Sequence, residues 1–569
     1  MLQYIKFIFL FFLFTCYTFA DTITLDSIRA QIHNTLSNHL KGSNQHIVRQ
    51  IYLSSGNTPL WINAKNRTKS KALIAALNNP LFNYKNKSFD RKSIKKLFYY
   101  LDNNNLTLPH KVAVYARLDV ILTNSFVRLI RFIVQGDVDW QLVHKKLLGL
   151  KESDDIKAHW EISVKPMPSI QSISNAIISG DIYPYLKSLI PMESRYTKLI
   201  KLLKKYRAMG KFPKVLYYGK TNKLGQSNKS IPFIKKRLKL SGDYPKGASM
   251  NSKFNKTLKQ AVIRFQKRYL LKITGEVDST TIYYLNKPLH EHIQAIITNL
   301  DKTKIYPKSF ENEYIEVNIP DFHLRYYKNN HKIMKMDLIV GRIDRPTPLF
   351  NSAVRYMVLN PTWTIPDNLI KRDLIHVLEE NPMYLKENNI HVFSGNKEVQ
   401  ITHDTIASYE NSSRRVPYRF VQFPGENNAL GRVKFMFPNR YAVYLHDTDN
   451  KTLFNRRYKV YSSGCMRVSK PFKLMHTLLS HTTGYSPDKL ESIFRTNKPY
   501  TIKLARPIPV HILYFTVYEE NGLAYFKYDI YLYDKIIEES VEGHKKPTFT
   551  IPSKRMIKIK KKDEKPLSN

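Results

Sequence analysis

Two side chains in the last quarter of the chain could together carry out acyl transfer. Cys465 lies in the stretch SSGCMRV, residues 462–468, and His446 precedes it by 19 residues. A thiol attacks a carbonyl as the thiolate, and a nearby imidazole can take its proton and later protonate a leaving amine. His446 follows an alternating run from Tyr441 to Leu445, which predicts a strand that ends at the histidine. The pair therefore predicts a cysteine nucleophile served by a histidine.

The residues around Cys465 suit the other needs of such a reaction. The successive backbone N–H groups of Ser463, Gly464 and Cys465 are little obstructed by side chains and could stabilise the oxyanion that forms when a thiolate attacks an amide. Arg467 could pair with a carboxylate of the substrate through two parallel hydrogen bonds. A lone histidine is more often structural, but a cysteine with histidine, glycine and arginine in this order is a stronger indication of catalysis.

A free thiol is a hazard in an exported protein, and the N-terminus predicts export. The chain has 2 cysteines, and Cys16 lies in the apolar run MLQYIKFIFLFFLFTCYTFA. This run predicts a signal peptide over residues 1–20 that is cleaved before Asp21, with an uncleaved anchor as the alternative. After cleavage, Cys465 could form no intramolecular disulfide, so it is either a functional thiol or a small buried side chain.

The composition is strongly basic. There are 91 Lys and Arg residues against 46 Asp and Glu, which gives a formal net charge of +45. Such a charge attracts polyanions, and an exported chain meets an anionic envelope rather than nucleic acid. The basic residues are spread along the chain, and we expect the concentrated run in the tail, residues 540–569, to be a solvated extension. The 18 histidines show no ligand spacing such as HExxH, so no metal site is predicted.

Periodicity predicts an α+β chain of several domains. Residues 21–224 carry helical periodicity in stretches such as VILTNSFVRLIRFIV, and the polar linker TNKLGQSNKS leads to a compact helical segment at 231–288. From Tyr314 onward, alternating runs such as YIEVNI and KMDLIVG predict strands. Residues 509–535 predict a hairpin with ENG as its turn, which would pack against the rest of the protein.

The compact segment carries a recognisable motif. It has an AV-x-x-FQ helix at residues 261–266, then Gly275 and a T-x-x-x-LN ending at residues 281–286. These features resemble the peptidoglycan-binding domain of many wall enzymes, although Leu270 and Asp278 stand where glycine is usual. The predicted three-helix core consists of Leu238, Leu258, Val262, Phe265, Leu271, Ile282 and Leu285. Peptidoglycan binding and a purely structural role both stay open for this module.

The segment HDTDNKTLFNRRYKVYSSGCMRV resembles the active-site segment of the L,D-transpeptidases with a YkuD-type catalytic domain. Three further stretches occur in the expected order: VNIPDFHLRYY, IVGRIDRPTPLFNSAVRYMVLNPTWTIP and QFPGENNALGRVKFMFPN. The resemblance is greatest to the large periplasmic subgroup, which joins a helical scaffold, a peptidoglycan-binding module and the catalytic domain. It implies a catalytic domain over residues 312–508, in which residues from about 367 to 424 form a cap over the cleft; a surface insertion is the alternative reading of this region.

The resemblance also implies roles for single residues. Cys465 would be the nucleophile and His446 the base and acid, with the backbone of Ser463 and Gly464 contributing to the oxyanion hole. Arg467 would help to position the substrate. Tyr444 is a candidate for lining the pocket, with packing as the alternative, and Asp447 could orient His446.

The implied reaction joins two peptide stems of peptidoglycan. Cys465 would attack the diaminopimelate carbonyl of a tetrapeptide stem and release D-alanine, and the resulting thioester would pass to an amine of a second stem to give a 3→3 cross-link. The implied partners are donor and acceptor stems, with other wall synthases as candidates and no nucleic acid. The implied location is the periplasm, associated with the inner membrane if the N-terminal segment is not cleaved. No cofactor is needed.

Three other functions stay open at this point. The same chemistry could attach peptidoglycan to a lipoprotein, because only the acceptor differs. The enzyme could chiefly hydrolyse its substrate as an L,D-carboxypeptidase. The protein could also be an inactive wall-binding scaffold, against which the pairing of Cys465 with His446 argues. The peptidoglycan-binding module and the cap favour cross-linking.

Overall fold

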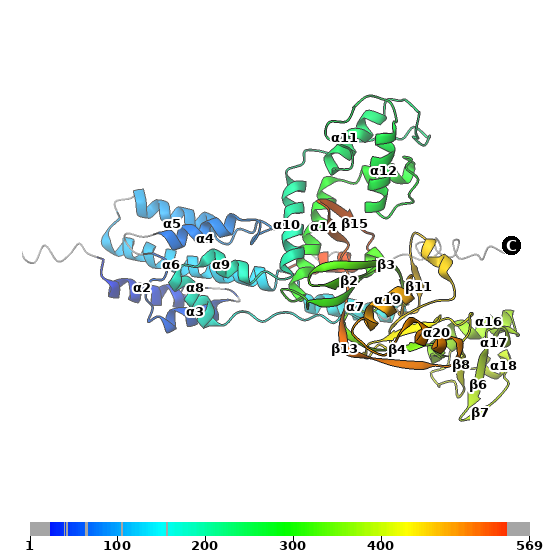
Figure 1. Ribbon diagram of the computed structural model, residues 1–569. Helices are drawn as coiled ribbons and strands as arrows, with labels where there is room; N and C mark the ends of the chain where they lie inside the picture. Colours follow the sequence, from blue (N-terminus) through cyan, green and yellow to red (C-terminus); the bar gives the residue numbers. More distant parts are fainter. Residues whose placement is uncertain are drawn as a thin grey trace, which may run out of the picture.

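A computed structural model describes residues 23–38, 40, 42, 44–62, 67–103, 106–154 and 158–542. A group of helices lies at one end of the molecule, and a small helical module and a β-rich domain lie at the other (Figure 1). This architecture confirms the predicted α+β fold class. The predicted signal peptide, residues 1–20, and most of the predicted basic tail lie outside the described residues.

The N-terminal helices pack around one long helix. Helix α6, Leu108–Val134, buries one apolar face against α2, α3, α4 and α5, and Pro109 stands in its first turn, where no N–H is needed. The bounds of the helices in this part are α2 (Leu25–Asn38), α3 (Gln45–Ser54), α4 (Thr68–Asn78), α5 (Arg91–Asn103), α6 (Leu108–Val134), α7 (Trp140–Asp154), α8 (Ile170–Ser179), α9 (Ile182–Ser188) and α10 (Glu193–Arg207).

One helix of this part belongs to the packing of the β-rich domain. Trp140, Val143 and Leu147 of α7 are buried in the same apolar cluster as the strands of that domain. Trp160 follows and forms a β-bridge with Leu349. The predicted scaffold at residues 21–224 therefore contains a stretch that contacts the β-rich domain directly.

The compact module consists of α11 (Ile231–Ser241), α12 (Lys256–Arg268) and α13 (Ser279–Leu285). All seven predicted core residues are buried. Asp278, a departure from the resembled pattern, caps α13, because its carboxylate accepts a hydrogen bond from the backbone N–H of Thr281 at 2.7 Å. The next helix, α14 (Leu289–Lys302), leads towards the β-rich domain.

The β-rich domain is built on a nine-stranded sheet with the order β11-β3-β12-β10-β9-β4-β13-β1-β2. The additional pairing of β2 with β3 closes every strand except β11 into a barrel. The bounds are β1 (Glu313–Asn318), β2 (His323–Lys328), β3 (His331–Gly341), β4 (Asn351–Leu359), β9 (Val433–Met436), β10 (Leu445–His446), β11 (Val460–Ser462), β12 (Met466–Val468) and β13 (Tyr500–Leu513). Helices α19 (Pro471–Leu479) and α20 (Pro487–Arg495) follow β12 and pack on the same core.

The region between β4 and β9 forms a separate subdomain, which we call the cap. Its sheet has the order β5-β8-β6-β7, and its apolar core, from Ile365 to Phe420, is distinct from that of the barrel. Its elements are β5 (Trp363–Thr364), α15 (Asp367–Leu369), a π-helix (Ile370–Leu374), α16 (Ile375–Glu380), α17 (Tyr384–Glu387), β6 (Ile390–Ser394), β7 (Lys397–Glu398), α18 (His403–Ala407) and β8 (Arg419–Gln422). Figure 1 shows the cap at the far end of the barrel domain from the N-terminal helices.

The C-terminal part contains a hairpin, but a shorter one than predicted. Strands β14 (Val517–Glu520) and β15 (Leu523–Phe526) pair through a turn in which Asn521 and Gly522 both have positive φ. The first residues of the predicted hairpin, 509–513, instead continue β13 of the barrel. Helix α21 (Tyr533–Glu538) follows the hairpin.

The predicted strand from Tyr441 to Leu445 is also wrong in extent, because β10 contains only Leu445 and His446. The side chain of Asn439 accepts hydrogen bonds from the N–H groups of Tyr441 and Val443 and donates one to the carbonyl oxygen of Val443 at 2.8 Å. These local bonds replace the pairing of a strand. Among the described residues, no helix is long and apolar enough to cross a membrane.

Candidate active site

Three strands bring the predicted catalytic residues to one face of the barrel. His446 on β10 is paired with Arg467 on the parallel strand β12 and with Lys434 on the antiparallel strand β9. Because side chains alternate along a strand, these three residues lie on the same face of the sheet. Cys465, two residues before Arg467, shares this side.

The opposite face explains why the register is fixed. Leu445 is paired with Met466 and with Phe435, and all three side chains are fully buried in the barrel core. A shift of one residue would move these apolar groups out of the core and the polar groups into it. The hydrophobic core therefore determines which side chains stand beside His446.

The loop between β11 and β12, Ser463 to Cys465, carries the thiol, and we call it the catalytic loop. Gly464 has φ +111°, a conformation that side chains rarely adopt. The hydroxyl of Ser462 donates to the carbonyl oxygen of Cys465 and accepts from the N–H of Gly464 at 3.3 Å. Of the three N–H groups predicted to bind an oxyanion, that of Gly464 is therefore already engaged with Ser462.

The thiol is partly exposed, and its surroundings are weakly solvated. The Sγ atom of Cys465 lies 3.9 Å from the carbonyl oxygen of Ala442. Burial raises the pKa of Cys465 to about 11, although hydrogen bonding with Tyr444 and the positive charges of Arg467 and Lys434 act in the opposite direction. At neutral pH the sulfur is therefore a thiol in the unliganded site.

His446 is 4% exposed, and its Nδ1 atom has no hydrogen-bond partner among the described residues. Burial lowers the pKa of His446 to about 3, and the positive charges of Arg467 and Lys434 add to this effect. The imidazole is therefore neutral at physiological pH and able to accept a proton. A neutral thiol and a neutral imidazole suit proton transfer during attack rather than a preformed ion pair.

The carboxylate of Asp447 is engaged with groups other than His446. This carboxylate pairs with Lys451 and accepts a hydrogen bond from the backbone N–H of Arg432 at 3.0 Å. The turn at Gly431 makes room for this carboxylate, because a Cβ atom on Gly431 would lie 2.4 Å from Asp447. Asn428 and Gly431 thus shape a turn beneath the site, in which the N–H of Gly431 donates to the carbonyl oxygen of Asn428 at 2.8 Å.

Tyr444 and Arg467 flank the thiol and the imidazole. The rings of Tyr444 and His446 lie 5.6 Å apart, and burial raises the pKa of Tyr444, as do the charge of Cys465 and a hydrogen bond with it. Arg467 donates from Nη1 to the hydroxyl of Thr448 at 3.3 Å, whereas its buried Nε has no partner within the described part of the chain. Burial also lowers the pKa of Arg467.

Three residues near the site were not singled out from the sequence. Lys434 lies beside His446 on β9, and Arg345 donates from Nη1 to the hydroxyl of Ser463 at 3.0 Å. Thr347 donates to the carbonyl oxygen of Gly464 at 2.9 Å. Arg345 and Thr347 lie in a stretch, GRIDRPTP, that carried the family resemblance, but nothing in its spacing linked it to Cys465. In the part of the chain that the structure describes, no group of His, Cys, Asp or Glu side chains is arranged to hold a metal ion.

Comparisons with known families agree with this architecture. Residues 312–487 match the L,D-transpeptidase catalytic domain (YkuD), and residues 46–203 match a family described as a scaffold domain. Residues 227–285 match a family described as "Putative peptidoglycan binding domain". The three matches follow the same order as the helical part, the module and the barrel.

A curated relative from Haemophilus influenzae, named "Putative L,D-transpeptidase", is 34% identical over 244 residues. The match covers 43% of this chain and 49% of the relative, so the chain spans about half the length of the curated relative that it matches.

Solved structures give a weaker likeness. The crystal structure of the L,D-transpeptidase from Xylanimonas cellulosilytica is 12% identical, with 52% of this chain and 100% of that chain covered and a TM-score of 0.18. The one from Stackebrandtia nassauensis is 11% identical, with 53% and 96% covered and a TM-score of 0.19. The family matches agree with the order of the domains: the barrel of this chain matches the catalytic domain of the YkuD-type L,D-transpeptidases, and it follows segments that match a scaffold domain and a peptidoglycan-binding domain.

Proposed function

We propose that this chain is an L,D-transpeptidase that forms 3→3 cross-links in peptidoglycan through a thioester on Cys465. The observation that carries the proposal is the register of β10 and β12, which puts His446, Arg467 and Cys465 on one face of a barrel that matches the YkuD family. The donor is a tetrapeptide stem, and the acceptor is the side-chain amine of diaminopimelate on a neighbouring stem.

In the first step, the sulfur of Cys465 attacks the carbonyl of the third residue of the donor stem. His446, neutral at physiological pH because of its lowered pKa, takes the thiol proton as the C–S bond forms. The tetrahedral intermediate then collapses, the C–N bond to D-alanine breaks, and His446 returns the proton to the leaving amine. A thioester remains on Cys465.

In the second step, the acceptor amine attacks the thioester. His446 takes a proton from this amine, the C–S bond breaks, and the proton returns to the sulfur of Cys465. The products are the new amide cross-link and free D-alanine, and the enzyme regains its thiol. No cofactor enters the balance.

The charges around the site support an anionic substrate. Arg467 and Lys434 place two positive groups next to Cys465, and the buried Nε of Arg467 lacks a partner among the described residues. A carboxylate of the stem could pair with this guanidinium, which would satisfy its donors. The same charges would favour the thiolate and the oxyanion as they form.

The cap supports transfer rather than hydrolysis. Its π-helix is joined to the barrel through Asp373 and Arg345, next to Ser463 of the catalytic loop. A subdomain held at this position can restrict the access of water to the thioester, which favours attack by the amine of a bound acceptor. We propose that the reaction takes place in the periplasm, with stem peptides as partners and other wall synthases as candidate partners.

Mass spectrometry of the protein and its products tests the function. Wild-type protein and Cys465→Ala would be incubated with a disaccharide that carries a tetrapeptide stem. An adduct on wild type only, together with tripeptide–tetrapeptide dimers, is the expected result. Release of D-alanine without dimers would identify either a carboxypeptidase or an enzyme that lacks its acceptor in this assay. A lysine-bearing lipoprotein peptide would then be added to test for a different acceptor.

The inactive-scaffold alternative has its own outcome. Folded wild-type protein that forms no adduct, releases no D-alanine and is not acylated by a carbapenem would overturn the enzymatic proposal. His446→Gln serves as a second variant, because it keeps the thiol and removes the base. We expect it to lose acylation by about 100-fold or more, since general base catalysis contributes roughly 10²- to 10⁴-fold.

A further inference from the structure

The turn between β3 and β4 contacts three successive residues at the catalytic loop. The N–H of Arg342 donates to the carbonyl oxygen of Ser462 at 2.8 Å. The guanidinium of Arg345 then reaches the hydroxyl of Ser463, and the hydroxyl of Thr347 reaches the carbonyl oxygen of Gly464. The turn therefore contacts the chain at three points just before Cys465, and Thr347 bonds to the residue that precedes it.

The hydroxyl of Thr347 has a fixed direction. The side chain is fully buried, and its Oγ1 accepts from the N–H of Gly341 at 2.9 Å and donates to Gly464 at 2.9 Å. A hydroxyl has one proton to donate, so the bond from Gly341 leaves that proton for the carbonyl oxygen of Gly464. Gly341 cannot be replaced without a shift of the turn, because a Cβ atom there would lie 2.2 Å from the carbonyl oxygen of Arg345.

This bond sets the orientation of the peptide that joins Gly464 to Cys465. In a trans peptide the C=O and the N–H point in opposite directions, and none of the described peptide bonds is cis. With the carbonyl of Gly464 held by Thr347, the N–H of Cys465 must point away from the turn. Glycine restrains rotation of its flanking peptides poorly, so the carbonyl needs an external anchor.

Tyr531, in the C-terminal part of the chain, fixes the position of Thr347. The hydroxyl of Tyr531 accepts from the backbone N–H of Thr347 at 3.2 Å and donates to the carbonyl oxygen of Gly341 at 2.7 Å. The N–H of Tyr531 donates to the hydroxyl of Tyr514 at 2.9 Å, and that hydroxyl donates to Asp529 at 2.6 Å. A series of hydrogen bonds thus connects Asp529 with the catalytic loop.

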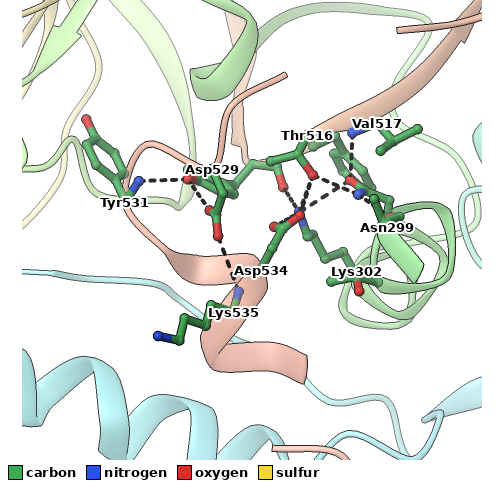
Figure 2. Close-up of polar contacts among 12 residues, drawn as sticks. Asn299, Lys302, Thr516, Val517, Asp529, Tyr531, Asp534 and Lys535 are labelled. Atoms are coloured by element: carbon green, nitrogen blue, oxygen red, sulfur yellow. Dashed lines mark hydrogen bonds and ion pairs between the residues drawn. The ribbon is translucent and has the colours of Figure 1, made fainter. Parts of the chain in front are cut away.

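Figure 2 shows the base of this series. Tyr531 and Asp529 lie on the segment between β15 and α21, and Asp534 of α21 points towards Lys302 of α14. Lys302 is fully buried and also donates to the carbonyl oxygen of Tyr514 at 2.9 Å. The segment that carries Tyr531 is therefore fixed to a neighbouring helix, and it lies beyond residue 487, where the match to the catalytic domain family ends.

We propose that Thr347 is a positioning residue that aims the N–H of Cys465 at the oxyanion, and that Tyr531 holds Thr347 in place. The inference rests on the proposed function, since an oxyanion forms only in an acyl transfer. Thr347 acts through the Gly464–Cys465 peptide, because its hydroxyl donates to the carbonyl oxygen of Gly464. The hairpin region at the C-terminus is thereby linked to catalysis and is more than a packing element.

Two covalent probes separate this role from general damage to the site. Acylation of Cys465 by a carbapenem passes through an oxyanion, whereas alkylation by iodoacetamide displaces iodide and forms none. Both rates would be measured by intact-protein mass spectrometry on Thr347→Val, Thr347→Ser and the control Thr477→Val. The control removes a hydroxyl that donates to the carbonyl oxygen of Lys473 at 2.8 Å within α19.

We expect Thr347→Val to slow acylation by about 10- to 100-fold, which is at most the effect of losing one whole oxyanion donor. The rate of alkylation should stay within about 2-fold of wild type. Thr347→Ser keeps the hydroxyl and should restore most of the acylation rate, and Tyr531→Phe should fall between wild type and Thr347→Val. Equal loss of both rates, or no loss of acylation, would overturn the inference. If wild type is alkylated but never acylated, the proposed function itself fails, which is a different result.

Discussion

The guanidinium of Arg345 donates two hydrogen bonds to the carboxylate of Asp373, from Nη1 to Oδ2 and from Nη2 to Oδ1, the latter at 3.0 Å. Arg345 belongs to the turn before β4 of the barrel, and Asp373 belongs to the π-helix of the cap. The Arg345 side chain is only 10% exposed, whereas that of Asp373 is 43% exposed, so water screens this pair from the cap side alone. The same Nη1 atom contacts Ser463, so one side chain connects the cap with the catalytic loop.

Under the proposed function, this connection predicts that the Arg345–Asp373 pair affects whether the thioester is hydrolysed or passed to an amine. Arg345→Met and Asp373→Asn each remove the pair, so each should raise the ratio of hydrolysis to cross-linking by about 3-fold or more, and the double variant should add little because one interaction is lost in all three. Product ratios from tetrapeptide substrate measure the effect. Asp404→Asn, a change at an exposed cap carboxylate, is the control. Independent, additive effects of the two substitutions would contradict the link.

The pH dependence of thiol reactivity follows from the two pKa values of the site. Only the thiolate reacts with iodoacetamide, and burial raises the pKa of Cys465 to about 11. The alkylation rate should therefore rise about tenfold for each pH unit from 7 to 10, without a plateau. Because the pKa of His446 lies near 3, the imidazole is already neutral in this range, and His446→Gln should show the same slope. A plateau near neutral pH would instead reveal a thiolate–imidazolium pair.

The part of the site that could be predicted from the sequence is the part encoded by short spacing. Cys465, Gly464 and Arg467 are close neighbours in the chain, and the alternation near His446 indicated a strand end. The register that pairs His446 with Arg467 follows from burial of Leu445 and Met466 on the other face. The α+β class followed from the change of hydrophobic period near Tyr314.

The contacts that could not be predicted from the sequence arise from pairing between strands that are far apart in the chain. Thr347 and Arg345 meet the catalytic loop because β3 pairs with both β11 and β12, and no local pattern encodes that pairing. The predicted strand at 441–445 was too long because one side chain, Asn439, bonds the backbone locally. Leu270 has φ +51°, in the left-handed region that favours glycine, which accounts physically for the glycine usual at this position in the resembled domain.

The turn beneath His446 should tolerate no side chain at Gly431. This residue has φ +59°, and an added Cβ would lie 2.4 Å from the Asp447 carboxylate, which is held by Lys451 and the N–H of Arg432. Gly431→Ala should lower the free energy of unfolding by about 2 kcal/mol or more, from backbone strain and steric conflict together. It should also slow acylation, because Asp447 adjoins His446.

Gly425 provides the matched control for this prediction. It lies in the same connection between the cap and β9, no heavy atom stands within 4 Å of a Cβ built there, and its φ is not positive. Gly425→Ala should therefore change the unfolding free energy by less than about 0.5 kcal/mol. Thermal unfolding followed by circular dichroism compares the two variants, and equal melting temperatures would refute the account of the turn.

The buried amine of Lys302 should be the main support of the C-terminal segment. It pairs with Asp534 and donates to the carbonyl oxygen of Tyr514, and its side chain is fully buried. Lys302→Met keeps most of the apolar stem but leaves the Asp534 carboxylate without its cation, which should cost about 3 kcal/mol of local stability. Adding Asp534→Asn removes the unpaired buried charge, so the double variant should be more stable than Lys302→Met alone.

Hydrogen exchange of residues 514–538 reports this stability directly, because an opened segment exchanges its amides faster. If Tyr531 supports Thr347 as proposed, exchange should become faster, and acylation slower, in the same order: wild type, the double variant, then Lys302→Met. Unchanged acylation in a variant whose segment opens readily would separate the C-terminal part from the catalytic loop.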